Sequence, residues 1–263
     1  MSELAYKDEA ASAYDRAFAH VTTHFLPFLL EAARVAPGQR VLDTATGTGI
    51  AAEAALGLVG ATGHVTATDY APAMVERARE RLGQFSNASV AVEDGQAMGF
   101  EAERFDAVTC SLGLMFFPSP AHGVTEFHRV LRPGGWAAAS VLTKPDRSYN
   151  GRINVVIARR QPALAEATAR TFSLGDESRL RALFEQAGFR SVEVTTVTHR
   201  FVLPSFDAYF SPFEQGGGST GQAYVALSPS DRHAVRLEIR RELGDDGGPV
   251  AVEVQLRIAC GQR

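Results

Sequence analysis

Small and acidic residues at three points of the chain have the types and spacing that could bind a nucleoside-containing cofactor. In residues 41–49 (Val-Leu-Asp-Thr-Ala-Thr-Gly-Thr-Gly), an apolar run passes into small residues that allow a ligand to approach the backbone. The spacing of Gly47, Gly49 and Ala52 is weak evidence for any one cofactor. Together with Asp69, 20 residues after Gly49, it also matches about half of the dinucleotide-binding motif. The loop therefore predicts cofactor binding and leaves two kinds of cofactor open.

The charge of Asp43 separates the two kinds of cofactor. Asp43 lies at the end of the apolar run, under the expected ligand, where the pyrophosphate of NAD would meet a carboxylate. A ligand with an ammonium and a sulfonium is attracted by the same charge. The sign favours S-adenosylmethionine (SAM) over NAD, and acids at 43, 69 and 94 together argue against a turn without a ligand.

A repeated βαβ pattern supplies the elements that position these acids. From Gln39 onward, short β-branched apolar runs alternate with amphipathic helical patterns, which is typical of a parallel sheet covered by helices. We expect strands over residues 40–43, 64–68, 89–92, 105–110 and 136–142. Between and after them we expect helices over residues 50–59, 72–82, 120–131 and 176–187.

Two further strands are expected to complete the sheet. Residues 191–202 form a β-rich run, and residues 250–258 are apolar at every even position, which predicts a half-exposed antiparallel strand at or near an edge. The expected fold class is α/β, a Rossmann-like seven-stranded, mostly parallel sheet with helices on both faces, an antiparallel C-terminal strand and a helical cap.

Segments that do not fit the alternation are expected to form the cap. Residues 143–175 and 204–249 are too long to be simple connections. The expected division of the chain is an N-terminal helical cap (1–36, with its helix over 14–36), a SAM-binding core (37–142), an insertion (143–175), more core (176–203), a cap insertion (204–249) and a core strand (250–263).

The composition narrows the partners and the compartment. The chain has 263 residues, and its 26 Lys and Arg against 30 Asp and Glu leave no basic footprint for a nucleic acid. Only Cys110 and Cys260 are present, too few for a disulfide framework or a thiolate metal site. No secretory signal or long apolar stretch occurs. We expect a cytoplasmic protein without a bound metal, a nucleic-acid partner or a membrane span, and a homodimer stays open.

Four motifs in the expected order resemble those of class I SAM-dependent methyltransferases. The resemblance is to the small-molecule branch that includes the ubiquinone and menaquinone biosynthesis C-methyltransferases, the type 11 methyltransferases. It is close over residues 35–141 and loose elsewhere. Ala45 departs from the commonest form of the first motif, which has Gly there, and Thr46 stands where Cys or a small residue is usual. The four motifs are residues 41–49, 66–74, 92–97 and 131–135.

The resemblance implies a role for each residue of the cofactor site. Asp69 would accept both ribose hydroxyls, Asp94 would accept from the adenine amino group, and Ser111 would lie near the sulfonium. The backbone of the first motif would hold the methionine end, Tyr70 and Met74 would pack on the adenine, and Gly95 and Gln96 would read its edge. The implied cofactor-binding set is Asp43, Ala45, Gly47, Gly49, Asp69, Tyr70, Met74, Asp94, Gly95, Gln96 and Ser111.

The loop after the fourth strand suggests the acceptor. Class I enzymes that methylate base amines carry an Asn-Pro-Pro-Tyr type signature there, and protein arginine methyltransferases carry a double-Glu loop. Residues 111–118 (Ser-Leu-Gly-Leu-Met-Phe-Phe-Pro) match neither and favour a small, partly hydrophobic acceptor. Met115 and Phe117 are candidate acceptor contacts, with core packing as the alternative, and Tyr14 and Phe18 are candidates from the N-terminal cap.

Catalysis needs few protein groups, because a sulfonium methyl is already electrophilic and alignment with the acceptor supplies much of the acceleration. A general base is required only for a poorly ionised hydroxyl or carbon acid, and His20 and His24 are the candidates, with a structural role as the alternative. The sequence thus predicts an enzyme that transfers methyl from SAM to O, N or C of a small molecule. An NAD(P)-dependent oxidoreductase, or a methyltransferase-like protein that uses SAM for other chemistry or only binds it, is the alternative.

Overall fold

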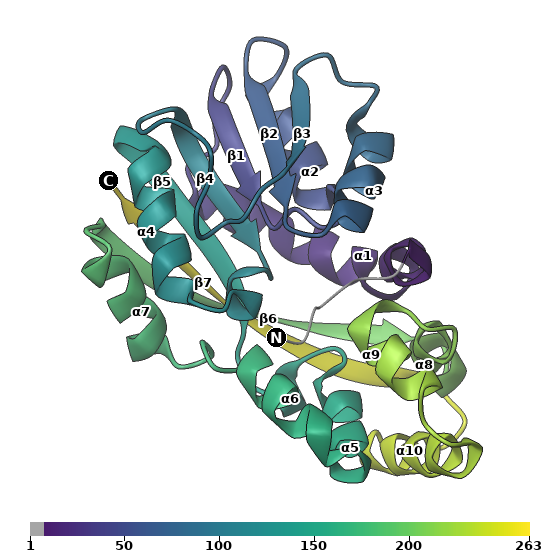
Figure 1. The fold of residues 1–263 in the computed structure, drawn as a ribbon. Coiled ribbons are helices and arrows are strands. Elements are labelled where there is room, and N and C mark those ends of the chain that lie inside the picture. Colours follow the sequence, from purple (N-terminus) through teal and green to yellow (C-terminus); the bar gives the residue numbers. More distant parts are fainter. Residues whose placement is uncertain (1–7) are drawn as a thin grey trace.

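A single mixed sheet organises the chain (Figure 1). The computed structural model describes residues 8–263, with side chains from residue 15 onward. The seven strands lie in the order β3-β2-β1-β4-β5-β7-β6, and β7 is antiparallel to both of its neighbours, as expected for this fold class. The strands are β1 (Arg40–Thr44), β2 (His64–Asp69), β3 (Ala88–Val92), β4 (Phe105–Ser111), β5 (Leu131–Leu142), β6 (Arg190–Leu203) and β7 (Val250–Gln262).

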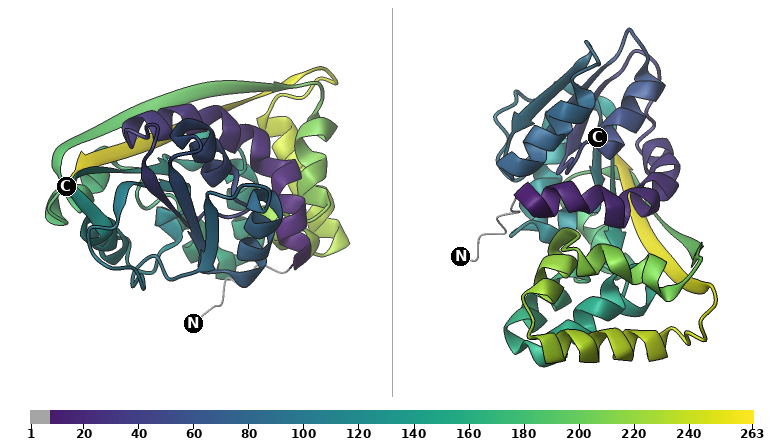
Figure 2. Two further views of the ribbon diagram at one scale, coloured as in Figure 1. Left: turned by 90° about the horizontal axis from the view of Figure 1, so that it is seen from above. Right: turned by 90° about the vertical axis from the view of Figure 1, so that its right-hand side faces the viewer.

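Helices cover both faces of the sheet (Figures 1 and 2). One face carries α1 (Asp8–Ala32), α2 (Ile50–Val59) and α3 (Pro72–Leu82), and their buried aliphatic side chains share a core with β1 and β2. The other face carries α4 (Pro120–Val130) and α7 (Glu177–Gln186), packed on β4 and β5. All five parallel strands therefore present their carboxyl ends, where cofactor residues are expected, at one edge of the sheet.

The helix boundaries follow the capping residues in the sequence. Pro72 opens α3, where its missing N–H is not needed. The Ser119 hydroxyl accepts a hydrogen bond from the His122 amide at the start of α4, and the Asp176 carboxylate accepts one from the Arg179 amide at the start of α7. These helices begin where the sequence predicts, because their start signals are local.

A helical layer extends beyond the carboxyl edge of the sheet. β5 ends opposite Leu256, whereas β6 and β7 continue to pair as far as Leu203 with Val250. This two-stranded arm carries a third hydrophobic core, in which the aromatic side chains of residues 206–213 are buried against Tyr149. The helices packed here are α5 (Gly151–Arg160), α6 (Ala165–Thr171), α8 (Phe206–Glu214), α9 (Gly218–Val225) and α10 (Pro229–Glu242), hereafter the cap helices.

The N-terminal helix differs from its predicted bounds. It was expected over residues 14–36, but α1 already includes Asp8 and ends at Ala32. Arg34 has a φ of 54°, so the chain leaves the helical conformation before Pro37-Gly38 rather than at it. The α1 helix runs between the sheet and the cap helices and contacts both (Figure 2).

The C-terminal strand is longer than predicted. It continues to Gln262 and lies one strand in from the edge, which β6 occupies. Its even-numbered residues from Val250 to Ile258 are buried, as the alternation predicts. None of the helices in the described part of the chain combines the length and apolar character that a membrane crossing requires.

Candidate active site

The glycine-rich loop between β1 and α2 is held in a conformation that few side chains tolerate. Ala45, Gly47 and Gly49 have φ values of 52°, 58° and 86°. The Thr46 amide donates to the Thr68 carbonyl of β2 at 2.9 Å, which fixes the loop to the neighbouring strand. A Cβ at Gly47 would meet no atom within 4 Å, so there is open space beside this backbone for a ligand.

Asp43 lies beneath this loop and is fully buried. One carboxylate oxygen accepts from the Thr46 hydroxyl at 2.5 Å, and the other accepts from the Thr109 hydroxyl at 2.7 Å. Burial raises the pKa of Asp43 to about 6, although the two hydroxyl donors oppose the shift. A carboxylate in this position would act on a cation in the site through its electric field rather than by direct contact.

Asp69 ends β2 on the other side of the loop. Its two oxygens accept from the Gly47 and Ala71 amides, both at 2.9 Å, and each retains a lone pair for a hydroxyl donor. Burial raises the pKa of Asp69, and these amide bonds oppose the shift. Tyr70 is 75% exposed, with its ring available to a ligand, whereas Met74 is only 4% exposed.

The loop after β3 brings Asp94 and Gln96 together. One Asp94 oxygen accepts from the Gln96 amide at 2.9 Å and from its side-chain Nε2 at 3.1 Å. The side-chain Oε1 of Gln96 accepts from the Ser119 amide at 2.7 Å, which joins the loop to the start of α4. A Cβ at Gly95 would lie 2.5 Å from the Phe117 ring, so this close approach requires glycine.

The residues after β4 lie at the same edge. Ser111 ends the strand and is partly exposed. Leu112 has a φ of 55°, a strained value for a leucine, and its amide donates to the Ser140 carbonyl at 3.1 Å. Its side chain contacts both the sheet core and the cap core. Nothing in the sequence signals this conformation, because no glycine or asparagine marks it.

The candidate acceptor contacts lie in different surroundings. Met115 is 2% exposed in the sheet core, and Phe117 packs between Gly95 and Gly123, whereas Phe116 is 43% exposed. Phe18 lies edge-on to Tyr149 and Phe213 of the cap core. The side chain of Tyr14 falls outside the described residues.

The candidate bases lie on α1 and face the β6–β7 arm. The His20 ring is edge-on to Tyr149, with centroids 5.0 Å apart, and the His24 ring is 3.6 Å from that of His199. Burial lowers the pKa of His20. Burial, and then the charge of His199, lower that of His24. Both imidazoles are therefore biased toward the neutral form that a general base needs.

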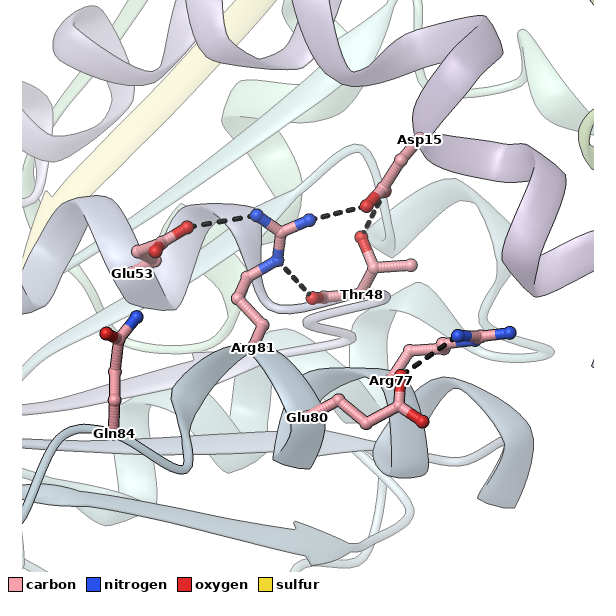
Figure 3. A pocket seen from close by; sticks show the side chains of 7 residues that line it. All are labelled: Asp15, Thr48, Glu53, Arg77, Glu80, Arg81 and Gln84. Atoms are coloured by element: carbon pink, nitrogen blue, oxygen red, sulfur yellow. Dashed lines mark hydrogen bonds and ion pairs between the residues drawn. The ribbon is translucent and has the colours of Figure 1, made fainter.

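Asp15 and Arg81 were missed by sequence reasoning. Arg81, on α3, donates to the Thr48 carbonyl at 2.8 Å and to Asp15, on α1, at 2.5 Å (Figure 3). No motif or local spacing connects residues 66 positions apart.

The sheet order and the site together define a class I SAM-dependent methyltransferase. An open α/β sheet binds ligands at the carboxyl ends of its strands, and here a glycine loop and two carboxylates converge there. The open space at Gly47 and the free lone pairs of Asp69 fit a cofactor with a ribose.

Comparison with known proteins agrees with this class. Residues 41–135 match a model of a methyltransferase domain. A demethylmenaquinone methyltransferase of Clavibacter sepedonicus is 34% identical over 75% of this chain and 89% of its own. A ubiquinone/menaquinone biosynthesis C-methyltransferase of Citrobacter koseri is 29% identical over 65% of this chain and 74% of its own. The chain belongs to the family of class I SAM-dependent methyltransferases that contains these enzymes.

Solved structures show the same fold. A putative methyltransferase of Bacillus halodurans superposes with a TM-score of 0.62 at 21% identity, over 90% of this chain and 97% of its own. Phosphoethanolamine N-methyltransferase 2 of Haemonchus contortus, solved with SAM, superposes with a TM-score of 0.63 at 16% identity, over 99% of this chain and 58% of its own. These likenesses show the fold alone. The family membership that the relatives show makes the protein a SAM-dependent methyltransferase, and the oxidoreductase alternative is not favoured.

Proposed function

We propose that the acceptor is a small aromatic compound of the quinol class and that the methyl group is transferred to its ring. The observation that carries the proposal is the 34% identity to a demethylmenaquinone methyltransferase across 89% of that enzyme. The aromatic junction of Phe18, His20 and Tyr149 between α1 and the cap core supports a flat, apolar acceptor.

The proposed donor site comprises the eleven residues inferred from the sequence, with Asp69 on the ribose and Asp94 on the adenine. Bound SAM supplies an electrophilic methyl group on a sulfonium. The backbone around Gly47 would hold the methionine end, and Asp43 would stabilise the adjacent positive charge from below. Ser111 and Leu112 would border the space between donor and acceptor.

The protein's part in the reaction is mainly alignment. Holding the acceptor in line with the methyl group can supply about 7 to 11 kcal/mol in favourable cases. A quinol carbon becomes nucleophilic as its hydroxyl loses a proton, and His20 is the proposed acceptor of that proton because burial lowers its pKa. As the ring carbon takes the methyl group, the electrons of the broken carbon–sulfur bond stay on sulfur, and the same ring carbon then loses its hydrogen as a proton to solvent, which restores the aromatic ring. Burial raises the pKa of Tyr149, so its hydroxyl stays protonated and can donate to an acceptor oxygen.

The same proposal includes three further points. The chain divides into a core and a cap, the protein is cytoplasmic, and its partner is the small-molecule acceptor. The third core around Tyr149 supports a cap that is distinct from the sheet cores. The formal net charge of −4 supports an uncharged or weakly charged acceptor rather than a nucleic acid.

The assay incubates the enzyme with SAM and chemically reduced demethylmenaquinone, and mass spectrometry follows the gain of one methyl group. Phosphoethanolamine is the control acceptor. Nuclear magnetic resonance of the product distinguishes a ring-carbon methyl from an O-methyl. His20→Ala should lower kcat and remove the acidic limb of the pH profile, the loss of rate as the pH falls through the His20 pKa, whereas His122→Ala on the surface of α4 should not. SAM binding without methylation of the quinol would contradict the proposed acceptor.

A mutation tests the donor site separately. Asp69→Ala should weaken SAM binding by ~2 to 4 kcal/mol, because two hydroxyls lose a charged acceptor in a largely buried site. Glu76→Ala, on the exposed face of α3, is the control. An unchanged dissociation constant for SAM with a native circular dichroism spectrum would show that Asp69 does not bind the ribose.

A further inference from the structure

A single guanidinium joins four elements behind the glycine loop. Arg81 of α3 donates from Nε to the Thr48 carbonyl at 2.8 Å, from Nη1 to Glu53 of α2 at 3.0 Å and from Nη2 to Asp15 of α1 at 2.5 Å. The second oxygen of Asp15 accepts from the Thr48 hydroxyl at 2.6 Å. Figure 3 shows these partners converging on Arg81. They line a groove with a volume of about 430 Å³.

The arrangement differs from an ordinary surface ion pair. The Arg81 side chain is 27% exposed, and all three of its nitrogens donate, which uses the planar fork that only arginine has. Arg77 lines the same groove one turn earlier, but its ion pair is with Glu80 on its own helix, and those side chains are 38% and 59% exposed. Arg77 is therefore a matched control for Arg81.

Thr48 lies between the two glycines that give the loop its shape. Asp69 holds the loop from the β2 side through the Gly47 amide. Arg81 and Asp15 hold it from the opposite side through the Thr48 carbonyl and hydroxyl. Neither Arg81 nor Asp15 is in the proposed cofactor-binding set, so they would act on the loop rather than on the ligand.

The same turn of α1 is fitted against the cap. A Cβ at Gly217 would lie 3.0 Å from Ala17 Cβ, and one at Gly218 would lie 2.6 Å from the Phe18 ring. The Phe18 ring also packs edge-on against Phe213, with centroids 5.7 Å apart. One helical turn thus contacts the donor loop through Asp15 and the cap through Phe18.

We propose that Arg81 is a positioning residue for methyl transfer, which locks α1 to the donor loop through Asp15 so that α1 transmits cofactor binding to the cap. The inference rests on the proposed donor site. It predicts that a ligand at the loop orders α1 and, through Phe18, the cap helices. By thermodynamic linkage, the factor by which the bound donor strengthens acceptor binding at the cap equals the factor by which the bound acceptor strengthens donor binding.

Hydrogen–deuterium exchange of the full chain, with and without S-adenosylhomocysteine, tests the transmission. In the wild type and in Arg77→Ala, the ligand should slow exchange in residues 15–25 and in residues 206–225. In Arg81→Ala both protections should shrink, and calorimetry should show about 10-fold weaker binding of SAM. Arg81→Lys should be intermediate, because a lysine keeps the charge and loses the fork. Phe18→Ala should keep the protection of α1 and lose that of the cap.

Two comparisons decide between failure of this inference and failure of the donor site. If Asp69→Ala leaves SAM affinity unchanged, the donor site is wrong. If Asp69→Ala weakens binding while Arg81→Ala retains wild-type affinity and wild-type protection of α1 and the cap, only the role of Arg81 is overturned. If Arg81→Ala does not fold, Asp15→Asn takes its place, because it removes the carboxylate charge that pairs with Arg81. The expected loss of SAM affinity and of exchange protection is the same.

Discussion

At the scale of single residues, the site depends on two carboxylates that the fold treats differently. Asp43 is buried and accepts from two hydroxyls, whereas Asp69 accepts from two backbone amides and keeps lone pairs for a ligand. Burial raises the pKa of both. Two buried negative charges are unfavourable unless a cation lies nearby. A cationic cofactor therefore stabilises the ionised carboxylates, and the ionised carboxylates stabilise the bound cofactor.

The titration of Asp43 should appear in SAM binding. With a pKa of about 6, Asp43 is ionised above that pH and attracts the positive ligand, so SAM affinity should fall as the pH drops through about 6. In Asp43→Asn that part of the pH dependence should vanish. In Thr109→Val, which loses one hydroxyl donor, it should move to higher pH. Calorimetry across pH measures it, and an identical profile in Asp43→Asn would assign the titration to another group.

At the scale of elements, the loops after β1 and β4 are built to fit each other. Ala45 takes a positive φ, and a Cβ at Gly113 would overlap its Cβ and lie 3.1 Å from Cys110 Sγ. Gly113 thus leaves room for the Ala45 side chain. Gly113 has a φ of −104°, which any residue can adopt, so the glycine is required for space and not for its backbone conformation.

Exchange of these two residues tests the fit. Gly113→Ala alone should destabilise the protein by ~1 to 3 kcal/mol, because the added methyl is forced into a packed contact. Ala45→Gly should be near neutral or slightly stabilising, since it relieves the positive φ. The double variant should recover most of the loss. Denaturant unfolding gives the three values, and strict additivity would show that the loops do not interact at this point.

The contact of α1 with β6 contains a histidine pair. The His24 ring lies against that of His199 at a centroid distance of 3.6 Å, tilted by 32°, with Phe201 beside both and His20 one turn earlier on α1. Burial, followed by the charge of His199, lowers the pKa of His24. The unfolded chain therefore binds more protons below about pH 6.5, and this contact loses stability as the pH falls through that value.

Replacement of His24 should flatten this response. Between about pH 8 and about pH 5.5, the Tm of His24→Gln should fall less than that of the wild type. His122→Gln, on the surface of α4, is the control and should follow the wild type. Asp43, with a pKa raised to about 6, shifts stability in the opposite sense in this window, so the comparison is between variants at each pH. A parallel loss in His24→Gln and wild type would contradict the assignment.

At the scale of the whole molecule, the proposed donor and acceptor sites lie in different hydrophobic cores that few elements join. The sheet carries the donor loop, the β6–β7 arm carries the cap core, and α1 passes between them (Figures 1 and 2). Alignment of two substrates requires the sheet and the cap to keep a fixed position relative to each other. The contacts of α1 with both would maintain that position.

Phe18→Ala should therefore separate the two substrates kinetically. Loss of the edge contacts to Tyr149 and Phe213 should raise the KM for the acceptor about 10-fold, with little change in SAM affinity, because Asp15 and Arg81 still hold the loop. Phe28→Ala, an aromatic on the same helix that is 42% exposed, is the control. Equal losses for donor and acceptor would place Phe18 in general support of the fold.

The seven-stranded, mostly parallel sheet with its antiparallel C-terminal strand and the helix starts could be predicted from the sequence alone, and so could the positions of Asp43 and Asp69 at the ends of strands. Each depends on local signals: alternation of apolar residues, a capping side chain, or a carboxylate at the end of a strand. For the same reason the resemblance to a methyltransferase was strongest over residues 35–141.

The tertiary structure alone decided which distant residues meet. The Arg81 link to Asp15, the ring contact of His24 with His199 and the fit of Ala45 to Gly113 join residues that no sequence spacing relates. Leu112 takes a strained φ because the packing of two cores over-determines it. Local propensity is a property of a few neighbouring residues, whereas these contacts exist only once separate elements have packed, so the sequence determined the class of chemistry and the packing determined how its parts are held together.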